Sequence, residues 1–246
     1  AWINLDSVQI WYFGSGCKAI KYSWENIFSA SFCCLTSLCI DVWNLFSKYK
    51  LHQELFYLYN HRFHPILRGR HEIPKPLHPI DWKSAFENYP DVVEKHFSKH
   101  ANINADAFIA LNTAFASDGV FVSVPDNTIL EKPTHIINLV SANQTGFFTP
   151  RNLFVVGKNS QVQFIETFEV IENSAKTISN SVTEILVEEN AKVQLYRLQN
   201  ENESAQQINS VCAAQQKNSN FDTNTVTLDG GWIRNNLNIA LNGENC

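Results

Sequence analysis

The spacing of hydrophobic and polar positions changes near residue 120. Before that point, Phe108, Leu111 and Phe115 recur at intervals that place them on one face of a helix. After it, the period is two, because Val120, Val122 and Val124 alternate along the chain until Pro125 ends the run. The pattern therefore predicts a short helical region followed by a series of β-strands.

Three helices are expected, and each begins at a capping signal. A small polar or acidic residue stands before each apolar run, where its side chain can accept a hydrogen bond from an unpaired backbone N–H group. Gly119 is expected to end the last of them. The helices are residues 82–89 after Asp81, 92–100 after Pro90-Asp91, and 107–118 after Asn104 or Asp106.

Short strands without intervening helical patterns fill the rest of the sequence. Turns rich in Gly or Asn separate them at fairly regular intervals. The expected strands are residues 120–124, 135–140, 152–156, 162–167, 182–187, 193–198, 207–213, 224–228 and 234–241.

Two of these strand–turn–strand units are repeats of each other. Residues 155–163 align with residues 186–194 at a constant offset of 31, and Asn159 and Asn190 occupy the same place in the turn. Residues 241–245 begin a third unit of the same shape. A fixed period of this kind predicts a solenoid, whose coils bury their apolar rows by stacking. A β-sandwich has similar turn spacing and is the alternative.

The turn asparagines and the Asn-rich last strands suit such a stack. Asn tolerates the left-handed backbone conformation and can hydrogen-bond to its own backbone. In residues 221–227 and 234–241, inward Asn side chains are expected to form ladders between coils.

These patterns divide the chain into three parts. Residues 1–80 are a poorly specified N-terminal region that ends in a Pro-rich linker at 73–79, residues 81–118 are a helical segment, and residues 119–246 are the β-helix core. Residues 27–46 have the length of a membrane span. They contain Asp41 and Asn44 and have no clear basic flank, so neither a membrane segment nor a signal peptide is expected.

Composition excludes some classes of protein. The 246 residues carry a net charge of −5 and no basic patch, which argues against nucleic-acid binding. The six cysteines lack zinc-ligand spacing and fit reduced thiols in a cytoplasmic protein. The sequence has no Met and stops at Asn245-Cys246 within a strand-like pattern, so both ends are expected to be cuts.

Five segments resemble the SufB/SufD family of iron–sulfur cluster assembly proteins. The join ALNTAFASDGVFVSVPDN is the most specific of them, whereas residues 1 to about 78 do not resemble the family's N-terminal region. The resemblance implies a mainly β fold, with a helical region before a right-handed parallel β-helix. The segments are residues 110–127, 131–141, 151–169, 180–201 and 230–246.

The family resemblance also implies a function and partners. Where the SufB type resembles the sequence EGC, this chain has Glu166-Thr167-Phe168, which favours the SufD type. A SufD-type chain is expected to be a non-catalytic, cytoplasmic scaffold subunit. It would pair with a SufB-type paralogue and a SufC-type ABC ATPase, and a transient iron–sulfur cluster would belong to the whole complex.

Few of the remaining residues indicate chemistry. His96 and His100 have the i, i+4 spacing of a two-His metal face, but no third ligand is placed, and solvated helix side chains are expected instead. Cys212 is expected to be packed in the core as a small hydrophobe. No catalytic, cofactor-binding or metal-binding residue is therefore assigned.

Asp222, Asp229 and Arg234 leave one alternative function, a β-helix carbohydrate-active enzyme, a lyase or hydrolase. Such an enzyme needs carboxylates placed together across one sugar. A β-solenoid surface adhesin would need a secretion signal, which the N-terminus does not supply.

Overall fold

The computed structural model describes four short strands in the first 80 residues and most of the chain from residue 81 onward. Residues 117–118, 141–144 and 171–175 are the exceptions in the second part. The chain divides into two units, Ala1–His52 and Gln53–Cys246. In the first, strands β1 (Ile10–Tyr12) and β2 (Ile20–Tyr22) pair antiparallel. The apolar stretch 27–46 and the linker 73–79 lie outside the described residues.

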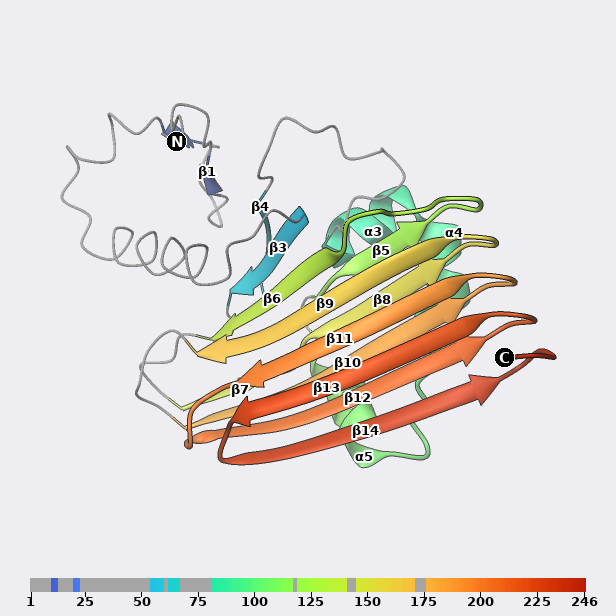
Figure 1. Ribbon diagram of the computed structural model, residues 1–246. Coiled ribbons are helices and arrows are strands. Elements are labelled where there is room, and N and C mark those ends of the chain that lie inside the picture. The colour runs from blue at the N-terminus through green and yellow to red at the C-terminus, as the bar shows by residue number, and fades with distance from the viewer. Residues whose placement is uncertain are drawn as a thin grey trace, which may run out of the picture. The chain divides into compact units, whose positions relative to one another are not determined.

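The second unit is a parallel β-helix with two sheets (Figure 1). Sheet 1 has the order β14-β12-β10-β8-β5, with β7 beside β10, and sheet 2 has the order β13-β11-β9-β6-β3-β4. From β8 onward the chain passes from one sheet to the other after each strand, so consecutive strands form coils. The strands are β3 (Glu54–Tyr59), β4 (Arg62–Ile66), β5 (Phe121–Val124), β6 (Thr134–Val140), β7 (Gly146–Phe148), β8 (Arg151–Val156), β9 (Gln161–Val170), β10 (Thr177–Val187), β11 (Lys192–Asn200), β12 (Ala205–Gln215), β13 (Asn220–Asp229) and β14 (Trp232–Leu241).

The stacking of coils confirms the repeat that the sequence predicts. Val155 pairs with Leu186 between β8 and β10, and Val162 pairs with Val193 between β9 and β11, so both pairs have the offset of 31. All of these ladders are parallel. Parallel pairing between successive coils fits a solenoid and excludes the antiparallel β-sandwich.

A ladder of asparagines runs along one edge of the stack. Asn127, Asn159, Asn190, Asn218 and Asn245 all have a positive φ between 55° and 60°. Each side-chain amide donates to the Oδ1 atom of the preceding asparagine, at 3.0, 3.1, 3.2 and 3.1 Å in chain order. The left-handed conformation costs Asn less than most residues, which explains why Asn recurs in these turns.

The two edges of the stack differ in the lengths of their connections. At the asparagine edge, residues 157–160, 188–191 and 216–219 join successive strands with four residues each. At the opposite edge, the connections shorten from six residues (171–176) to four (201–204) and then two (230–231). The spacing between ladder asparagines therefore falls from 32 residues to 31, 28 and 27.

The apolar core occupies the part of the interior near the asparagine edge. Valine, isoleucine and phenylalanine side chains from both sheets meet there, and the rings of Phe154 and Phe164 stack with centroids 4.4 Å apart. Phe154, Ile185 and Ala213 form one apolar row that crosses three successive coils. Each coil buries its row only against its neighbours, as the period predicts.

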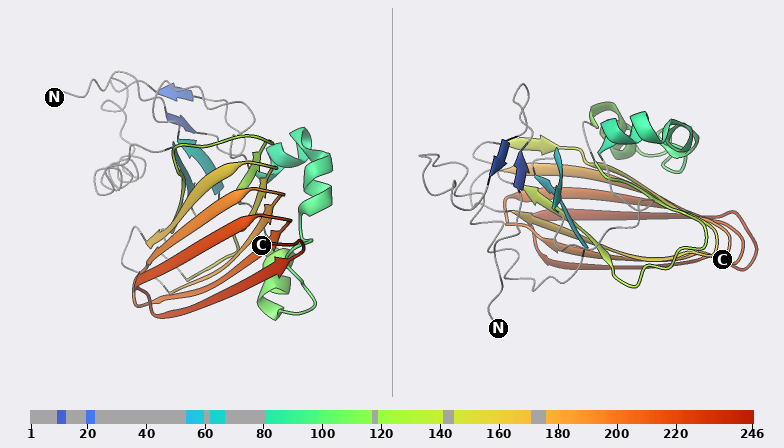
Figure 2. Two further views of the ribbon diagram at one scale, coloured as in Figure 1. Left: turned by 45° about the vertical axis from the view of Figure 1, so that its right-hand side comes forward. Right: turned by 90° about the horizontal axis from the view of Figure 1, so that it is seen from above.

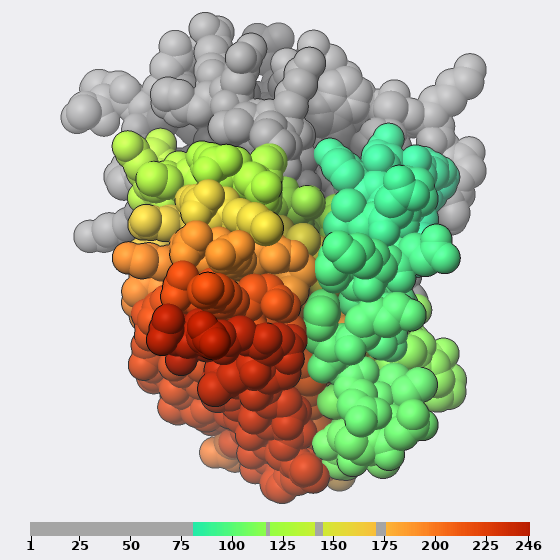
Figure 3. Space-filling model, turned by 90° about the vertical axis from the view of Figure 1, so that its right-hand side faces the viewer, coloured from blue at the N-terminus to red at the C-terminus, as the bar shows by residue number. Residues whose placement is uncertain are grey.

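Helices cover the outer face of sheet 1 (Figure 2) and form a continuous flank beside the layered coils (Figure 3). They are α3 (Trp82–Asn88), α4 (Pro90–His96) and α5 (Ala107–Phe115). The caps agree with the sequence: the carboxylate of Asp81 accepts from Ser84 N at 2.6 Å, and that of Asp106 accepts from Phe108 N at 2.7 Å. The second helix is shorter than predicted, because Phe97 ends it and Ser98 adopts a φ of 59°.

Helix α5 buries a different face from the one that its apolar spacing suggests. Ile109 and Asn112 are its buried residues, whereas Leu111 and Phe115 are 37% and 61% exposed. Asn112 faces sheet 1 because its amide donates to the carbonyl oxygens of Pro150 (3.0 Å) and Asn180 (2.7 Å). Helix α5 therefore presents to the sheet the face that carries Asn112, which differs from the face that the apolar spacing predicts.

A fully buried ion pair fixes the helical region to the sheet. Arg151 Nη2 on β8 lies 2.5 Å from Glu184 Oε1 on β10, and neither side chain is accessible to solvent. The carboxylate of Glu184 also accepts the backbone N–H groups of Ser98, His100 and Ala101, at 2.8, 2.8 and 3.0 Å. The carboxylate of Glu184 thus accepts three backbone N–H groups that follow α4 and also pairs with Arg151 on the neighbouring strand.

Gly119 lies where the helical region joins the β-helix. A Cβ atom there would sit 1.6 Å from the carbonyl oxygen of Arg151. The same oxygen accepts a hydrogen bond from Trp82 Nε1 at 2.8 Å. Glycine is required for this close approach, whereas the helix itself already ends at Phe115.

Strands β3 and β4 extend sheet 2 beyond the predicted core. They pair antiparallel with each other, and β3 pairs parallel with β6. Residues 1–80, which the sequence pattern leaves poorly specified, contain the strands β1 to β4.

Substitutions at Asn190 separate the two roles of a ladder asparagine. Asn190→Gly keeps the left-handed turn and removes the amide contacts, so we expect the free energy of unfolding to fall by about 1 kcal/mol. Asn190→Ala adds the backbone penalty and should lower it by about 2 kcal/mol. Urea denaturation measures both values, and equal losses for the two variants would contradict the backbone role.

Neutralising Glu184 should destabilise the chain strongly. Glu184→Gln leaves Arg151 buried without its counter-charge, so we expect a loss of about 3 kcal/mol or more in the free energy of unfolding. Hydrogen exchange should also rise in residues 82–115. The control is Glu189→Gln, because Glu189 pairs with Lys158 at 3.7 Å on the exposed surface and should contribute less than about 1 kcal/mol. Similar losses in the two variants would argue against a stabilising role of the buried Arg151–Glu184 ion pair.

Candidate functional site

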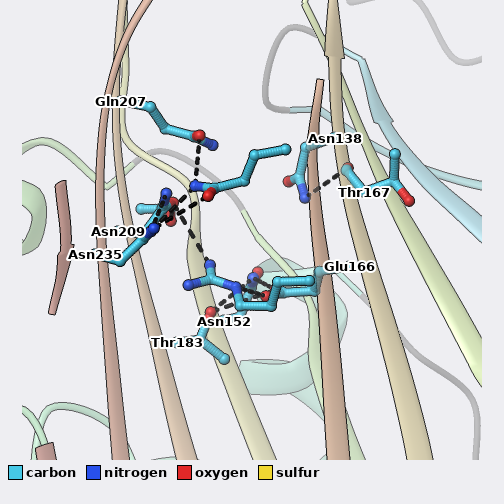
Figure 4. A network of polar contacts seen from close by, with 11 residues as sticks. Asn138, Asn152, Glu166, Thr167, Thr183, Gln207, Asn209 and Asn235 are labelled. Atoms are coloured by element: carbon cyan, nitrogen blue, oxygen red, sulfur yellow. Dashed lines mark hydrogen bonds and ion pairs between the residues drawn. The ribbon is translucent and has the colours of Figure 1, made fainter. Parts of the chain in front are cut away.

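Beyond the apolar core, the interior of the β-helix becomes polar (Figure 4). Buried carboxylate, guanidinium, amide and hydroxyl groups from successive coils fill it, and they bond mainly to one another rather than to solvent. We call this set the polar interior; its members are Asn152, Glu166, Ser181, Thr183, Arg197, Gln199, Glu201, Gln207, Asn209, Thr227 and Asn235.

An ion pair between Glu166 and Arg197 stands at the centre of the polar interior. Arg197 Nε lies 2.8 Å from Glu166 Oε2, with 2% and 0% of the two side chains exposed. The other oxygen of Glu166 accepts from Asn152 Nδ2 at 3.0 Å. The arginine lies over the ring of Phe168, with 5.3 Å between its Cζ atom and the ring centroid. Both charges therefore have partners within the stack of coils.

Gln199 links the ion-pair region to the later coils. Its Nε2 atom donates to Gln207 at 2.8 Å and to Asn235 at 3.1 Å, and its Oε1 atom accepts from Thr227 at 2.6 Å. Asn209 makes a second link, because its oxygen accepts from Ser181 at 2.5 Å and its amide donates to Asn235 at 3.2 Å. The network thus reaches β14, where the inward Asn235 forms the expected amide contact between coils. Asn238 of the same strand instead bonds to Cys212 on the helix-facing side.

Glu201 follows β11 at the far end of the polar interior. It is 3% exposed, and burial raises the pKa of its carboxyl from the ordinary value of 4.5 to about 7. Its Oε2 atom has no hydrogen-bond partner among the described residues, and neither has the buried Nε2 atom of Gln207. Glu201 is therefore partly protonated near pH 7, where an ordinary glutamate is fully ionised. The sequence does not reveal this, because the residue lies in a polar turn of the chain.

His135 is a second titratable group with a shifted pKa, on the other face of sheet 2. It is 3% exposed, and its Nε2 atom lies 2.8 Å from the hydroxyl of Thr167. Burial lowers the pKa of its imidazole to about 4. The side chain is therefore neutral near pH 7.

The expectation that His96 and His100 are solvated side chains of one helix is wrong. Helix α4 ends at His96, which is 8% exposed, and His100 follows in the next loop. Their rings stack with centroids 5.7 Å apart at an angle of 19°. Burial is the main cause that lowers the pKa of each imidazole. Within the described part of the chain, no three His, Cys, Asp or Glu residues come together in a way that could hold a metal ion.

Cys212 packs as a small hydrophobe, as predicted. It lies on the helix-facing side of sheet 1, in a cluster with Ala101, Ile109 and Val182, and is 2% exposed. Burial raises the pKa of its thiol, so little reactive thiolate forms near neutral pH.

The carboxylates of the carbohydrate-enzyme alternative do not meet. Asp222 and Asp229 lie near opposite ends of β13, roughly 23 Å apart at the usual rise of a strand. Asp222 lines a groove of about 460 Å³ on sheet 2 with Glu131, Lys192 and several amides. Arg234 lies over the ring of Phe108 and within 4.0 Å of Asp106 instead. The paired carboxylates and arginine that this alternative requires are therefore not assembled.

Replacing Glu201 with Gln should change how stability depends on pH. The unfolded carboxyl releases its proton near pH 4.5 and the folded one near 7, so this residue reduces stability as pH rises between those values. We expect Glu201→Gln to be more stable than the parent by about 3 kcal/mol at pH 8, with the difference vanishing below about pH 4.5.

His135 acts in the opposite direction, because its folded pKa of about 4 lies below the ordinary value of 6.5 and stability is lost as pH falls through that window. Its contribution is the same in the parent and in Glu201→Gln. It therefore cancels from the difference between their urea denaturation curves. A difference that does not vary with pH would contradict the raised pKa of Glu201.

Two family models match consecutive parts of the chain. The model of the SufBD protein N-terminal region matches residues 47–136, and that of the SUF system FeS cluster assembly SufBD core domain matches residues 138–246. The expectation that residues 1 to about 78 do not resemble the family is therefore wrong from residue 47 onward. No helix in the described ranges is both long and apolar enough to span a membrane.

Curated relatives agree with the family models. A SufBD family iron–sulfur cluster assembly protein of Synechocystis is 27% identical over 78% of this chain and 44% of its own length. One from Pyrococcus horikoshii is 28% identical over 69% and 40%, and the SufD protein of Bacillus subtilis is 28% identical over 46% and 26%. The chain thus spans less than half the length of these relatives. The repeat, the β-helix and the two matched models together place this chain in the SufBD family of iron–sulfur cluster assembly proteins.

Proposed function

We propose that this chain is a SufD-type, non-catalytic scaffold subunit of the SUF iron–sulfur cluster assembly complex. The observation that carries the proposal is the environment of Phe168, which occupies the position of the cysteine in the SufB-type sequence EGC. Its ring is 1% exposed and lies beneath the guanidinium of Arg197. A packing aromatic thus stands at that position, and the neighbouring acid, Glu166, is held in an ion pair.

In this proposal the iron–sulfur cluster is a cargo of the complex rather than a resident group of this chain. Assembly of a cluster needs accessible thiolates. Of the two cysteines that the structure describes, Cys212 is buried beneath α5, where burial raises the pKa of its thiol, and Cys246 is exposed. A single accessible thiol does not supply the several ligands that a cluster needs. The proposal therefore assigns cluster ligation to other parts of the complex and a supporting role to this chain, in the cytoplasm.

The proposed partners are a SufB-type paralogue and a SufC-type ABC ATPase. Both partners are proposed from the family to which the chain belongs and from the environment of Phe168 and Glu166 described above.

Co-expression tests the proposal. The tagged chain is produced with the SufB-type paralogue and the ABC ATPase of the same organism, and we expect affinity capture to retain both. Capture of neither partner would contradict the scaffold role.

A further inference from the structure

Two buried ion pairs connect the same two neighbouring coils, and the positions of arginine and glutamate are exchanged between them. We call β8–β9 coil 2, β10–β11 coil 3 and β12–β13 coil 4. On the helix-facing side, Arg151 of coil 2 pairs with Glu184 of coil 3. In the interior the order is reversed, because Glu166 of coil 2 pairs with Arg197 of coil 3. Coil 2 thus supplies an arginine and then a glutamate, and coil 3 supplies the complement.

The contacts that repeat along the stack do not distinguish one coil from another. Every ladder asparagine makes the same amide hydrogen bond to its neighbour, and the apolar rows combine side chains of similar kind. If a coil is left out of the stack, it loses its own burial and backbone hydrogen bonds, but the two coils that close over the gap regain equivalent repeating contacts with each other. The backbone ladders add no discrimination, since every parallel strand offers the same groups.

Coil 4 lacks the charges that would let it replace coil 3. The position in register with Glu184 is Cys212, and the position in register with Arg197 is Thr225. If coil 4 stacked directly on coil 2, Arg151 and Glu166 would both be buried without counter-charges. If coil 2 stacked on a second copy of coil 2, like charges would meet at both places. Either arrangement buries unpaired charge at a high cost.

We propose that the two ion pairs specify the order of the coils, so that coil 3 and no other coil stacks on coil 2. A wrong order of coils leaves buried charges without partners and is therefore disfavoured. The asparagine ladder and the apolar rows stabilise the stack but do not specify the order of its coils. Because the device acts within one chain, it is independent of the partners proposed above.

Disulfide trapping during refolding can report the order of the coils. All six native cysteines are first replaced by Ala or Ser. A native-order reporter carries Gln163→Cys and Gln194→Cys, because these residues pair in register between coils 2 and 3 and are exposed. A wrong-order reporter carries Gln163→Cys and Asp222→Cys. Asp222 pairs in register with Gln194, so it reaches residue 163 only if coil 3 is left out of the stack.

The interior pair is then altered in both reporters, which refold from denaturant in a glutathione buffer. Without further change, we expect the 163–194 disulfide and only background amounts of the 163–222 disulfide. Glu166→Arg places two arginines at the joint and should raise the ratio of wrong-order to native-order disulfide by about tenfold or more.

The double variant E166R with R197E restores an ion pair in reversed order and is the matched control. It should return the ratio to the parent value, because the charges of coils 2 and 3 are again complementary. The disulfide ratio is measured in every refolding mixture, so it reports even on chains that do not reach the native state. The proposal is overturned if Glu166→Arg leaves the ratio unchanged, or if the double variant is no better than the single one.

Discussion

Each coil of the β-helix depends on the coils beside it for its backbone hydrogen bonds. A single coil has two strands that face each other across the interior, so its N–H and C=O groups find partners only in the next coil. The asparagine ladder, the apolar rows and the polar interior all follow this direction of stacking. The helices depend on it as well, because the Arg151–Glu184 pair that anchors them joins two neighbouring coils. Stability and the placement of the helical region therefore come from the same contacts.

The repeating part of the fold could be predicted because its signals are local. A turn that requires a left-handed residue selects Asn at each coil, and the offset of 31 between Asn159 and Asn190 is visible without any structure. The helix caps at Asp81 and Asp106 are local in the same way. By contrast, the buried face of α5 is associated with hydrogen bonds to Pro150 and Asn180, and β3 joins the sheet through β6, far along the chain. Such partners leave no periodic trace in the sequence.

The polar interior was harder to predict than the stack. The family resemblance drew attention to Glu166, but Arg197 is separated from it by 31 residues and becomes its partner only when two coils align. Glu201 shows the same limit, because an isolated glutamate in a turn gives no sign that burial will raise its pKa to about 7. His96 shows the same limit, because the ring that stacks on it, His100, lies beyond the end of its helix.

The unequal connections at the two edges of the stack give the protein one fixed side and one adjustable side. Four-residue turns that hold a left-handed asparagine at each step leave no room for an insertion without breaking the ladder. The opposite edge already uses six, four and two residues for equivalent connections, so added or lost residues there leave the strand registers intact. Evolution can therefore diversify this edge independently of the core.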